Sequence, residues 1–103
     1  PELGGTLRME RSRGSGISAA RLGAAPVTIR ARKGGERLRP HATAATRTVK
    51  NLMQEARMPP WQRDRVPFIY CGEQLVCVPG IAIHSAFHAG PRESCIVPVW
   101  RTD

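Results

Sequence analysis

The chain has 103 residues, which is enough for one domain built around one hydrophobic core. Hydrophobic residues make up 41% of it and charged residues 23%, values that exclude a wholly disordered chain. No stretch approaches the ~20 apolar residues of a membrane-spanning helix, and the chain opens without an initiator Met or the apolar run of a secretory signal. We therefore expect a cytoplasmic domain cut from a longer protein, whose missing part is a candidate for the chemistry.

The charge balance is strongly positive. Sixteen Lys+Arg against eight Asp+Glu give a net charge of +8. All of these cations except Lys33 and Lys50 are arginines, whose guanidinium binds phosphate oxygens bidentately. A GC-rich coding bias would explain the ratio of Arg to Lys, but not the total excess of positive charge. The balance indicates a polyanionic partner, with nucleic acid as the first candidate.

Two strands are expected in the first third of the chain. Apolar and polar residues alternate in Gly5–Glu10 and, more clearly, in Val27–Arg32, which is typical of a half-buried strand. Between them, Arg11–Gly16 is predicted as a basic loop. The segment that follows is ambiguous, with one helical turn expected at Ala19–Leu22.

A glycine pair, Gly34-Gly35, follows the second strand and suits a tight hairpin turn. Pairing across this turn places Ala31 opposite Leu38 on the core side. Four arginines then share the other face: Arg30, Arg32, Arg37 and Arg39. Like charges directly opposite one another are destabilising, so such a face makes physical sense beneath an anion. The alternative is that Pro40 shortens the second arm and the arginines splay into solvent.

A helix is predicted between Thr43 and Arg57, because apolar residues recur at helical spacing. The apolar positions are Ala45, Val49, Leu52, Met53 and Ala56. The opposite face carries Arg47 and Lys50. Pro59-Pro60 prevents the helix from continuing. A basic helix face by itself is usually just solvated, but here it adds to the arginines of the expected hairpin.

The segment Trp61–Pro67 is expected to be a loop or a single turn. Asp64 lies between Arg63 and Arg65 and is placed to form an ion pair with one of them. Trp61 has two candidate roles. It could stack on a base or ribose, but a Trp that follows two prolines more often packs on the core and anchors its loop.

The rest of the chain is rich in predicted strands. Phe68–Cys71 and Leu75–Val78 form the arms of a hairpin, and both arms are apolar on both sides, so sheet faces covered on both sides are expected. Ile81–Phe87 is a further strand candidate. Ser94–Trp100 is the last, and its Pro98 confines it to an edge or a bulge. One main helix among about six short strands predicts an α+β fold.

The Cys and His residues do not predict a catalytic or metal site. Cys71, Cys77, His84 and His88 have the spacing Cys-x5-Cys-x6-His-x3-His, which differs from that of a zinc finger. An odd number of cysteines, completed by Cys95, is typical of reduced thiols in an intracellular protein. No phosphate-binding loop motif or carboxylate pair occurs in the sequence. We expect a binding domain with no metal and no catalytic residue of its own.

Three segments together resemble the C-terminal domain of bacterial tRNA(Ile)-lysidine synthetase. Arg30–Pro40 carries R-x-R-x-G-G-E-R, Thr48–Ala56 is the Lys-bearing helix, and Pro59–Pro67 reads P-P-W-x-R-D-R-x-P. The resemblance is most specific over residues 26–80. It predicts that residues 1–103 form a single C-terminal tRNA-binding domain.

The resemblance implies an ATP-dependent ligase that attaches lysine to the wobble cytidine of a minor isoleucine tRNA, so that the tRNA decodes AUA. In that family the site for ATP, with magnesium, is an S-G-G-x-D-S loop in an N-terminal catalytic domain. The loop does not occur in this sequence, so no catalytic residue is carried over. The implied fold is a small α+β unit similar to a domain of the phenylalanyl-tRNA synthetase beta subunit, and its implied partner is the tRNA acceptor arm.

Eight cations are expected to contact RNA phosphates: Arg30, Arg32, Arg37, Arg39, Arg47, Lys50, Arg63 and Arg65. Trp61 is expected to anchor the loop that presents the last two. The other expected partners are the N-terminal domains of the same enzyme and a second copy in a homodimer. The alternatives are a structural or dimerisation module of that enzyme, a stand-alone basic RNA-binding module, and an independent enzyme that uses Cys77 and His84.

Overall fold

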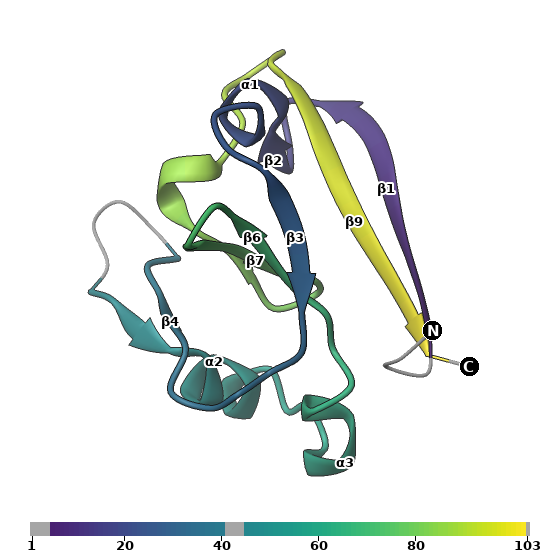
Figure 1. The fold of residues 1–103 in the computed structure, drawn as a ribbon, viewed down its shortest axis with the longest axis vertical. Coiled ribbons are helices and arrows are strands. Elements are labelled where there is room, and N and C mark those ends of the chain that lie inside the picture. The colour runs from purple at the N-terminus through teal and green to yellow at the C-terminus, as the bar shows by residue number, and fades with distance from the viewer. Residues whose placement is uncertain (1–4, 41–44, 103) are drawn as a thin grey trace.

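The computed structural model describes residues 5–40 and 45–102, and its strands pair only in antiparallel fashion. The strands are β1 (Gly5–Arg13), β2 (Ile17–Ser18), β3 (Val27–Arg30), β4 (Arg37–Leu38), β5 (Arg47–Thr48), β6 (Phe68–Cys71), β7 (Gln74–Val78), β8 (Ala82–Ile83) and β9 (Ser94–Thr102). The helices are α1 (Ala19–Leu22), α2 (Val49–Glu55), α3 (Pro60–Arg63) and the 3-10 turn η1 (Ser85–Phe87). One sheet has the order β1-β9-β2, a second has the order β3-β6-β7-β8, and β4 and β5 form a ribbon (Figure 1).

The β6-β7 hairpin lies at the centre of the fold, as its apolar sequence predicted. On one face, Phe68 packs with Leu52 and Met53 of α2. On the other face, Ile69 packs with Ile17 of β2 in a second cluster that lies against the β1-β9-β2 sheet. Covered faces on both sides of this hairpin are therefore confirmed, and the hairpin is the scaffold on which α2 rests.

Strand β1 is longer than expected. It pairs with β9 from Gly5 opposite Thr102 to Arg13 opposite Ser94. The first three residues of the predicted basic loop Arg11–Gly16 therefore belong to this strand. Strand β1 extends this far because β9 offers nine residues to pair with, and no local pattern in the sequence of β1 reveals this partner. Strand β2 pairs only with Cys95 and Ile96, near the start of β9. Among the described residues, Pro98 therefore has a neighbouring strand, β1, on one side only, which is the edge position that a proline requires.

The predicted hairpin around Gly34-Gly35 does not form. Strand β3 pairs with β6, with Arg30 opposite Phe68, whereas β4 pairs with β5, with Arg37 opposite Thr48. The apolar β6 is a better partner for β3 than a short arm that would set arginine against arginine. Strand β3 is also an edge strand, so the half-buried pattern expected there is wrong: Val27 is 43% exposed and Ile29 47%.

Helix α2 is shorter than the predicted helix, whose first two residues lie outside the described part of the chain. It begins at Val49 because Thr48 caps it: the Thr48 side chain accepts a hydrogen bond from the Asn51 backbone N–H, and Arg47 and Thr48 pair as β5. Val49, Leu52 and Met53 face the core as predicted.

The end of α2 is a Schellman motif. The backbone N–H of Met58 donates to the carbonyl of Met53 at 3.0 Å, and that of Arg57 donates to Gln54 at 3.0 Å. The motif requires a left-handed residue, and Arg57 adopts it with φ of 59°. Any residue other than glycine is strained in this conformation, because its Cβ atom crowds the backbone.

Replacing Arg57 with glycine is therefore expected to raise the free energy of unfolding by about 0.5–1 kcal/mol, since the lost strain exceeds the added chain entropy. Urea unfolding of Arg57→Gly followed by circular dichroism measures this change. Arg57→Ala, which keeps the Cβ atom, is the matched control and should differ little from the parent. A glycine variant less stable than the alanine variant would contradict the prediction.

The segment after β7 is only partly the strand predicted at Ile81–Phe87. Strand β8 spans Ala82–Ile83, and the chain then turns into η1, where the His84 Nδ1 atom accepts a hydrogen bond from the Ala86 N–H at 3.1 Å. The helical turn expected at Ala19–Leu22 is confirmed as α1. Within the described residues, no helix is both long and apolar enough to cross a membrane.

Candidate nucleic-acid interface

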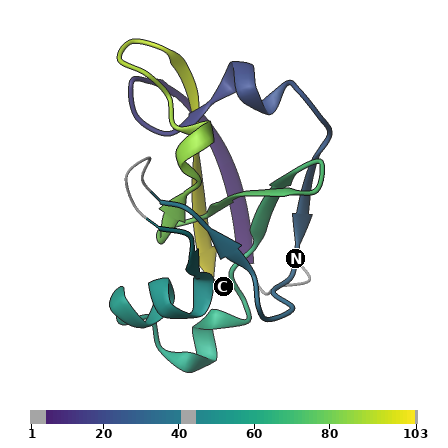
Figure 2. The same ribbon diagram turned by 90° about the vertical axis from the view of Figure 1, so that its left-hand side faces the viewer.

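One end of the molecule is built from α2, α3, β4 and the loop of residues 31–36 (Figures 1 and 2). Two contacts join these elements: the Val49 N–H donates to the carbonyl of Glu36 at 2.9 Å, and Arg32 of the loop pairs with Asp64 at the end of α3. Six cations come from these elements and the residues directly after α3, and we call them the basal surface: Arg32, Lys33, Arg37, Lys50, Arg63 and Arg65.

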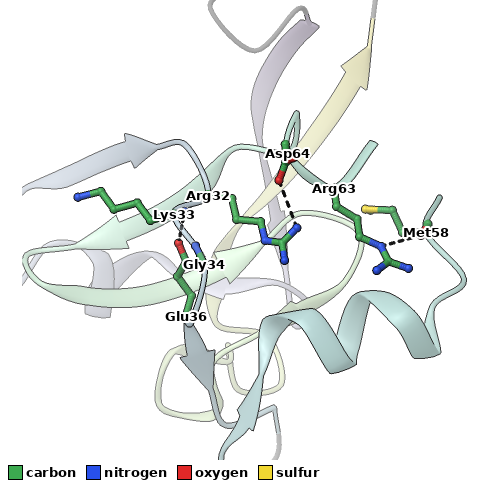
Figure 3. A network of polar contacts seen from close by, with 7 residues as sticks. All are labelled: Arg32, Lys33, Gly34, Glu36, Met58, Arg63 and Asp64. Carbon is green, nitrogen blue, oxygen red and sulfur yellow. Dashed lines mark hydrogen bonds and ion pairs between the residues drawn. The ribbon is translucent and has the colours of Figure 1, made fainter. Parts of the chain in front are cut away.

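The loop of residues 31–36 is shaped by a carboxylate rather than by strand pairing. Glu36 accepts hydrogen bonds from the backbone N–H groups of Lys33 at 2.6 Å and Gly34 at 2.9 Å (Figure 3). Gly34 and Gly35 have φ of 106° and 80°, values that side chains rarely tolerate. The glycine pair therefore makes a turn, as predicted, but a turn closed by Glu36 within a loop.

Asp64 fixes the loop to α3. Its carboxylate lies 3.2 Å from the Arg32 guanidinium, whose side chain is only 18% exposed (Figure 3). Asp64 was expected to pair with a neighbouring arginine of its own segment, and the ion pair shown is with Arg32 of the loop. Arg63 instead donates from Nε to the Met58 carbonyl at 3.0 Å, which closes the turn of α3. Arg32 is thus a largely covered member of the basal surface that joins the loop to the end of α3.

Arg37 and Lys50 are two exposed cations among the predicted contacts. Arg37 pairs with Thr48 across the ribbon, and Lys50 stands two residues later on the exposed side of α2. Both side chains are exposed, and neither has a carboxylate partner within residues 5–40 and 45–102. Their charges are therefore available to an external anion.

Arg30 does not contribute to the basal surface. Its guanidinium lies 4.3 Å from the centre of the Tyr70 ring, donates to the Gly72 carbonyl at 3.2 Å and pairs with Glu73 at 3.5 Å. It is therefore folded back along β6 toward the β6-β7 turn. The prediction that this arginine shares a face with those of β4 is wrong, because it depended on a hairpin that does not form.

Arg47 is also directed elsewhere. It forms a two-pronged ion pair with Glu55, and both residues line a cleft of about 550 Å³ together with Leu52, Ile83 and His88. The hydrogen bond with Arg47 lowers the pKa of the Glu55 carboxyl, which keeps it ionised. This carboxylate neutralises Arg47, so the charge of Arg47 is less available to an external anion than the charges of Arg37 and Lys50.

Arg39 lies beside η1. Its carbonyl accepts a hydrogen bond from the Ser85 N–H at 2.7 Å. Burial lowers the pKa of His84, and the positive charges of Arg39 and then His88 lower it further, so all three lie near one another. The eight predicted cations therefore do not all lie on one surface. Lys33 is an exposed cation of the basal surface that was not among the predicted contacts.

Trp61 lies on the surface and not in the core. It was expected to pack on the core, yet it is 74% exposed, more than any other large hydrophobic residue of the described chain. The turn is anchored by Met58, which packs against the core cluster of α2, and by Val66, which is 3% exposed. The prolines and the Arg63 hydrogen bond hold the turn without help from the indole.

The buried cysteines do not form a nucleophilic site. Burial raises the pKa of Cys77 to about 12, and the Cys71 thiol points to the backbone carbonyls of Leu22 and Ala25. No cluster of three or more His, Cys, Asp or Glu in the described residues is placed to hold a metal ion. These observations argue against the alternative in which Cys77 and His84 catalyse a reaction.

We expect the thiols to be inert in the folded chain at pH 8, where a pKa of about 12 leaves roughly one Cys77 in ten thousand as thiolate. Titration with an aromatic disulfide, with and without urea, measures this reactivity. The three cysteines should react only after unfolding. A fast reaction of Cys77 in native buffer would revive the catalytic alternative.

Sequence comparison identifies the family. Residues 27–100 match the family described as the TilS substrate C-terminal domain. The chain belongs to this family. The matched residues run from β3 into β9 and include the entire basal surface of this TilS C-terminal domain.

Two relatives show how much of the longer protein the domain represents. The chain is 40% identical over 98 residues to the tRNA(Ile)-lysidine synthase of Nitrosomonas europaea, which is 95% of this chain and 21% of that protein. It is 45% identical over 89 residues to the tRNA(Ile)-lysidine synthase of Coxiella burnetii, which is 86% of this chain and 20% of that protein. The chain thus spans about a fifth of the length of these relatives.

A solved structure confirms the fold. The crystal structure of a TilS C-terminal domain superimposes with a TM-score of 0.73 at 23% identity, covering 97% of this chain and 85% of that one. The predicted α+β class, with mostly antiparallel strands and few helices, is therefore confirmed for this small domain.

Proposed function

We propose that this chain is the tRNA-binding C-terminal domain of a ligase that uses ATP to attach lysine to the wobble cytidine of tRNA(Ile). The observation that carries the proposal is the set of exposed cations at one end of the molecule, above all Arg37 and Lys50, which lack carboxylate partners in the described structure. The names of the related synthases support tRNA as the polyanion.

The proposed contacts are with the RNA backbone of the acceptor arm. Duplex RNA is recognised mainly by its shape, phosphates and 2′-hydroxyls, because its deep major groove excludes side chains. Lys33, Arg37, Lys50 and Arg63 suit this role, and Arg65 stands beside them. Such contacts would add affinity and orientation with little choice of sequence.

The chemistry is assigned to the rest of the enzyme. ATP and magnesium would bind an N-terminal catalytic domain outside this chain, since the S-G-G-x-D-S loop does not occur in these 103 residues. The domain would act in the cytoplasm beside those N-terminal domains. The likeness to a phenylalanyl-tRNA synthetase domain and the homodimer remain predictions.

Binding of an unmodified tRNA(Ile) transcript by the chain, measured against salt concentration, tests the proposal. Four cations that each neutralise one phosphate predict a slope of log K against log salt of roughly −3 to −4. A slope near zero, or no binding at low salt, would contradict the proposal.

A structural module of the same enzyme is the second candidate. It is favoured by Val27 and Ile29, two apolar residues left 43% and 47% exposed on the edge strand β3. A full-length synthase that loses this domain yet binds tRNA normally would favour this alternative.

A further inference from the structure

Trp61 has no role in holding its own turn, although it stands on the same end of the molecule as the basal surface. It is 74% exposed, whereas the next most exposed large apolar residue of the described chain, Ile29, is 47% exposed. An indole left in water forfeits the burial that normally determines where a Trp lies. The flat face of this indole is therefore available to a ligand.

The turn that carries Trp61 is ordered from several sides. Pro60 occupies the first position of α3, and the Gln62 N–H donates to the Pro59 carbonyl at 3.0 Å. Arg63 closes the turn through the Met58 carbonyl, and Asp64 fixes it to Arg32 of the neighbouring loop (Figure 3). An exposed ring on an ordered backbone binds a partner with little loss of conformational entropy.

The surroundings of the ring favour a nucleobase over a protein. Residues three apart lie on the same side of a helical turn, so Trp61 shares its side of α3 with Asp64, which binds the Arg32 guanidinium. The residues that follow Trp61 are all polar or charged: Gln62, Arg63, Asp64 and Arg65. An exposed ring that is followed by polar and charged residues matches a flat base attached to a charged backbone, whereas a protein interface has a continuous apolar centre.

We propose that Trp61 is a stacking platform for an unpaired base of the RNA bound at the basal surface. The base must be unpaired because, inside a duplex, neighbouring base pairs cover both faces of each base. The inference rests on the proposed function and adds a contact of a different kind to it. The basal cations bind phosphates, and the indole takes one base without regard to its sequence.

Three variants test this assignment: Trp61→Ala, Trp61→Phe, and Ile29→Ala as a matched control that also truncates an exposed apolar residue. Loss of one stacked base is expected to weaken binding of a tRNA transcript roughly 5- to 100-fold in the alanine variant. The phenylalanine variant should retain most of the affinity, and the control should match the parent. The salt slope should stay unchanged in every variant, because no phosphate contact is removed.

Fluorescence supplies a direct readout. A single-stranded octanucleotide should quench the emission of the parent chain, and the quenching should vanish in Trp61→Phe, which retains Trp100. A blunt RNA duplex at the same concentration should quench much less. Quenching that persists in Trp61→Phe, or a Trp61→Ala variant that binds tRNA like the parent, would overturn the stacking assignment.

The two proposals fail in different ways. If the parent chain binds tRNA with the expected salt slope and Trp61→Ala does the same, only the stacking assignment is wrong, and the indole belongs to a protein interface. If the parent chain binds no tRNA at low salt, the proposed function itself is wrong.

Discussion

Reversing two charges together, Arg37→Glu with Lys50→Glu, is expected to weaken tRNA binding at least about tenfold at low salt. Both side chains are exposed without carboxylate partners in the described structure, so each is free to neutralise a phosphate. Losing two such contacts should also flatten the log–log salt slope by about 1.8. Filter binding or fluorescence anisotropy over a range of salt concentrations gives both quantities.

The control has the same change in net charge at the other end of the molecule. Arg11→Glu with Arg13→Glu alters the far end of β1, which lies away from α2 and α3 (Figure 1). This variant should keep the parent salt slope nearly unchanged. Equal losses in the two variants would mean that overall charge, and not the basal surface, governs binding.

The largest expected effect on stability comes from Phe68→Ala. Phe68 is fully buried in β6, where it packs between the central hairpin and α2. Removing such a ring costs about 3–5 kcal/mol, a large part of the roughly 5–15 kcal/mol that stabilises a typical domain. Urea unfolding followed by circular dichroism measures the loss.

Its matched control is Ile29→Ala on the neighbouring strand β3. Ile29 is 47% exposed, so truncation removes little buried area and should cost less than about 1 kcal/mol. A similar loss in the two variants would contradict the placement of the core between β6 and α2.

The elements that the sequence predicts correctly are those whose signal is local. Residues Phe68–Cys71 are apolar on both sides of the strand, and they lie between two covered faces. Val49, Leu52 and Met53 recur at helical spacing and face the core. In these cases the same residues that define the element also determine which side is buried.

The pairing partner of a strand or of a charged side chain can lie far away in the sequence, and the predictions that depended on such partners were wrong. The glycine pair after β3 suggested a hairpin, but β3 pairs instead with β6, which places Arg30 opposite Phe68. Arg47 looked like a free helix cation, yet Glu55 lies within reach once Thr48 starts the helix late. Only the folded chain decides which arginines remain available to an external anion.

The exposure of Trp61 was also not predictable from the local sequence. Its position after two prolines favours an anchor, because most such residues are buried. Here Met58 and Val66 supply the apolar contacts of the turn, so the indole is left outside. No pattern in the sequence reveals that the anchoring role is already filled.

Amide chemical shifts of the 15N-labelled chain, recorded while tRNA(Ile) is added, give the most direct test that the basal surface meets the RNA backbone. The largest changes are expected at residues 32–37, 48–51 and 61–65, with few along β1 and β9. Changes concentrated on those two long strands, or spread evenly over the chain, would contradict it.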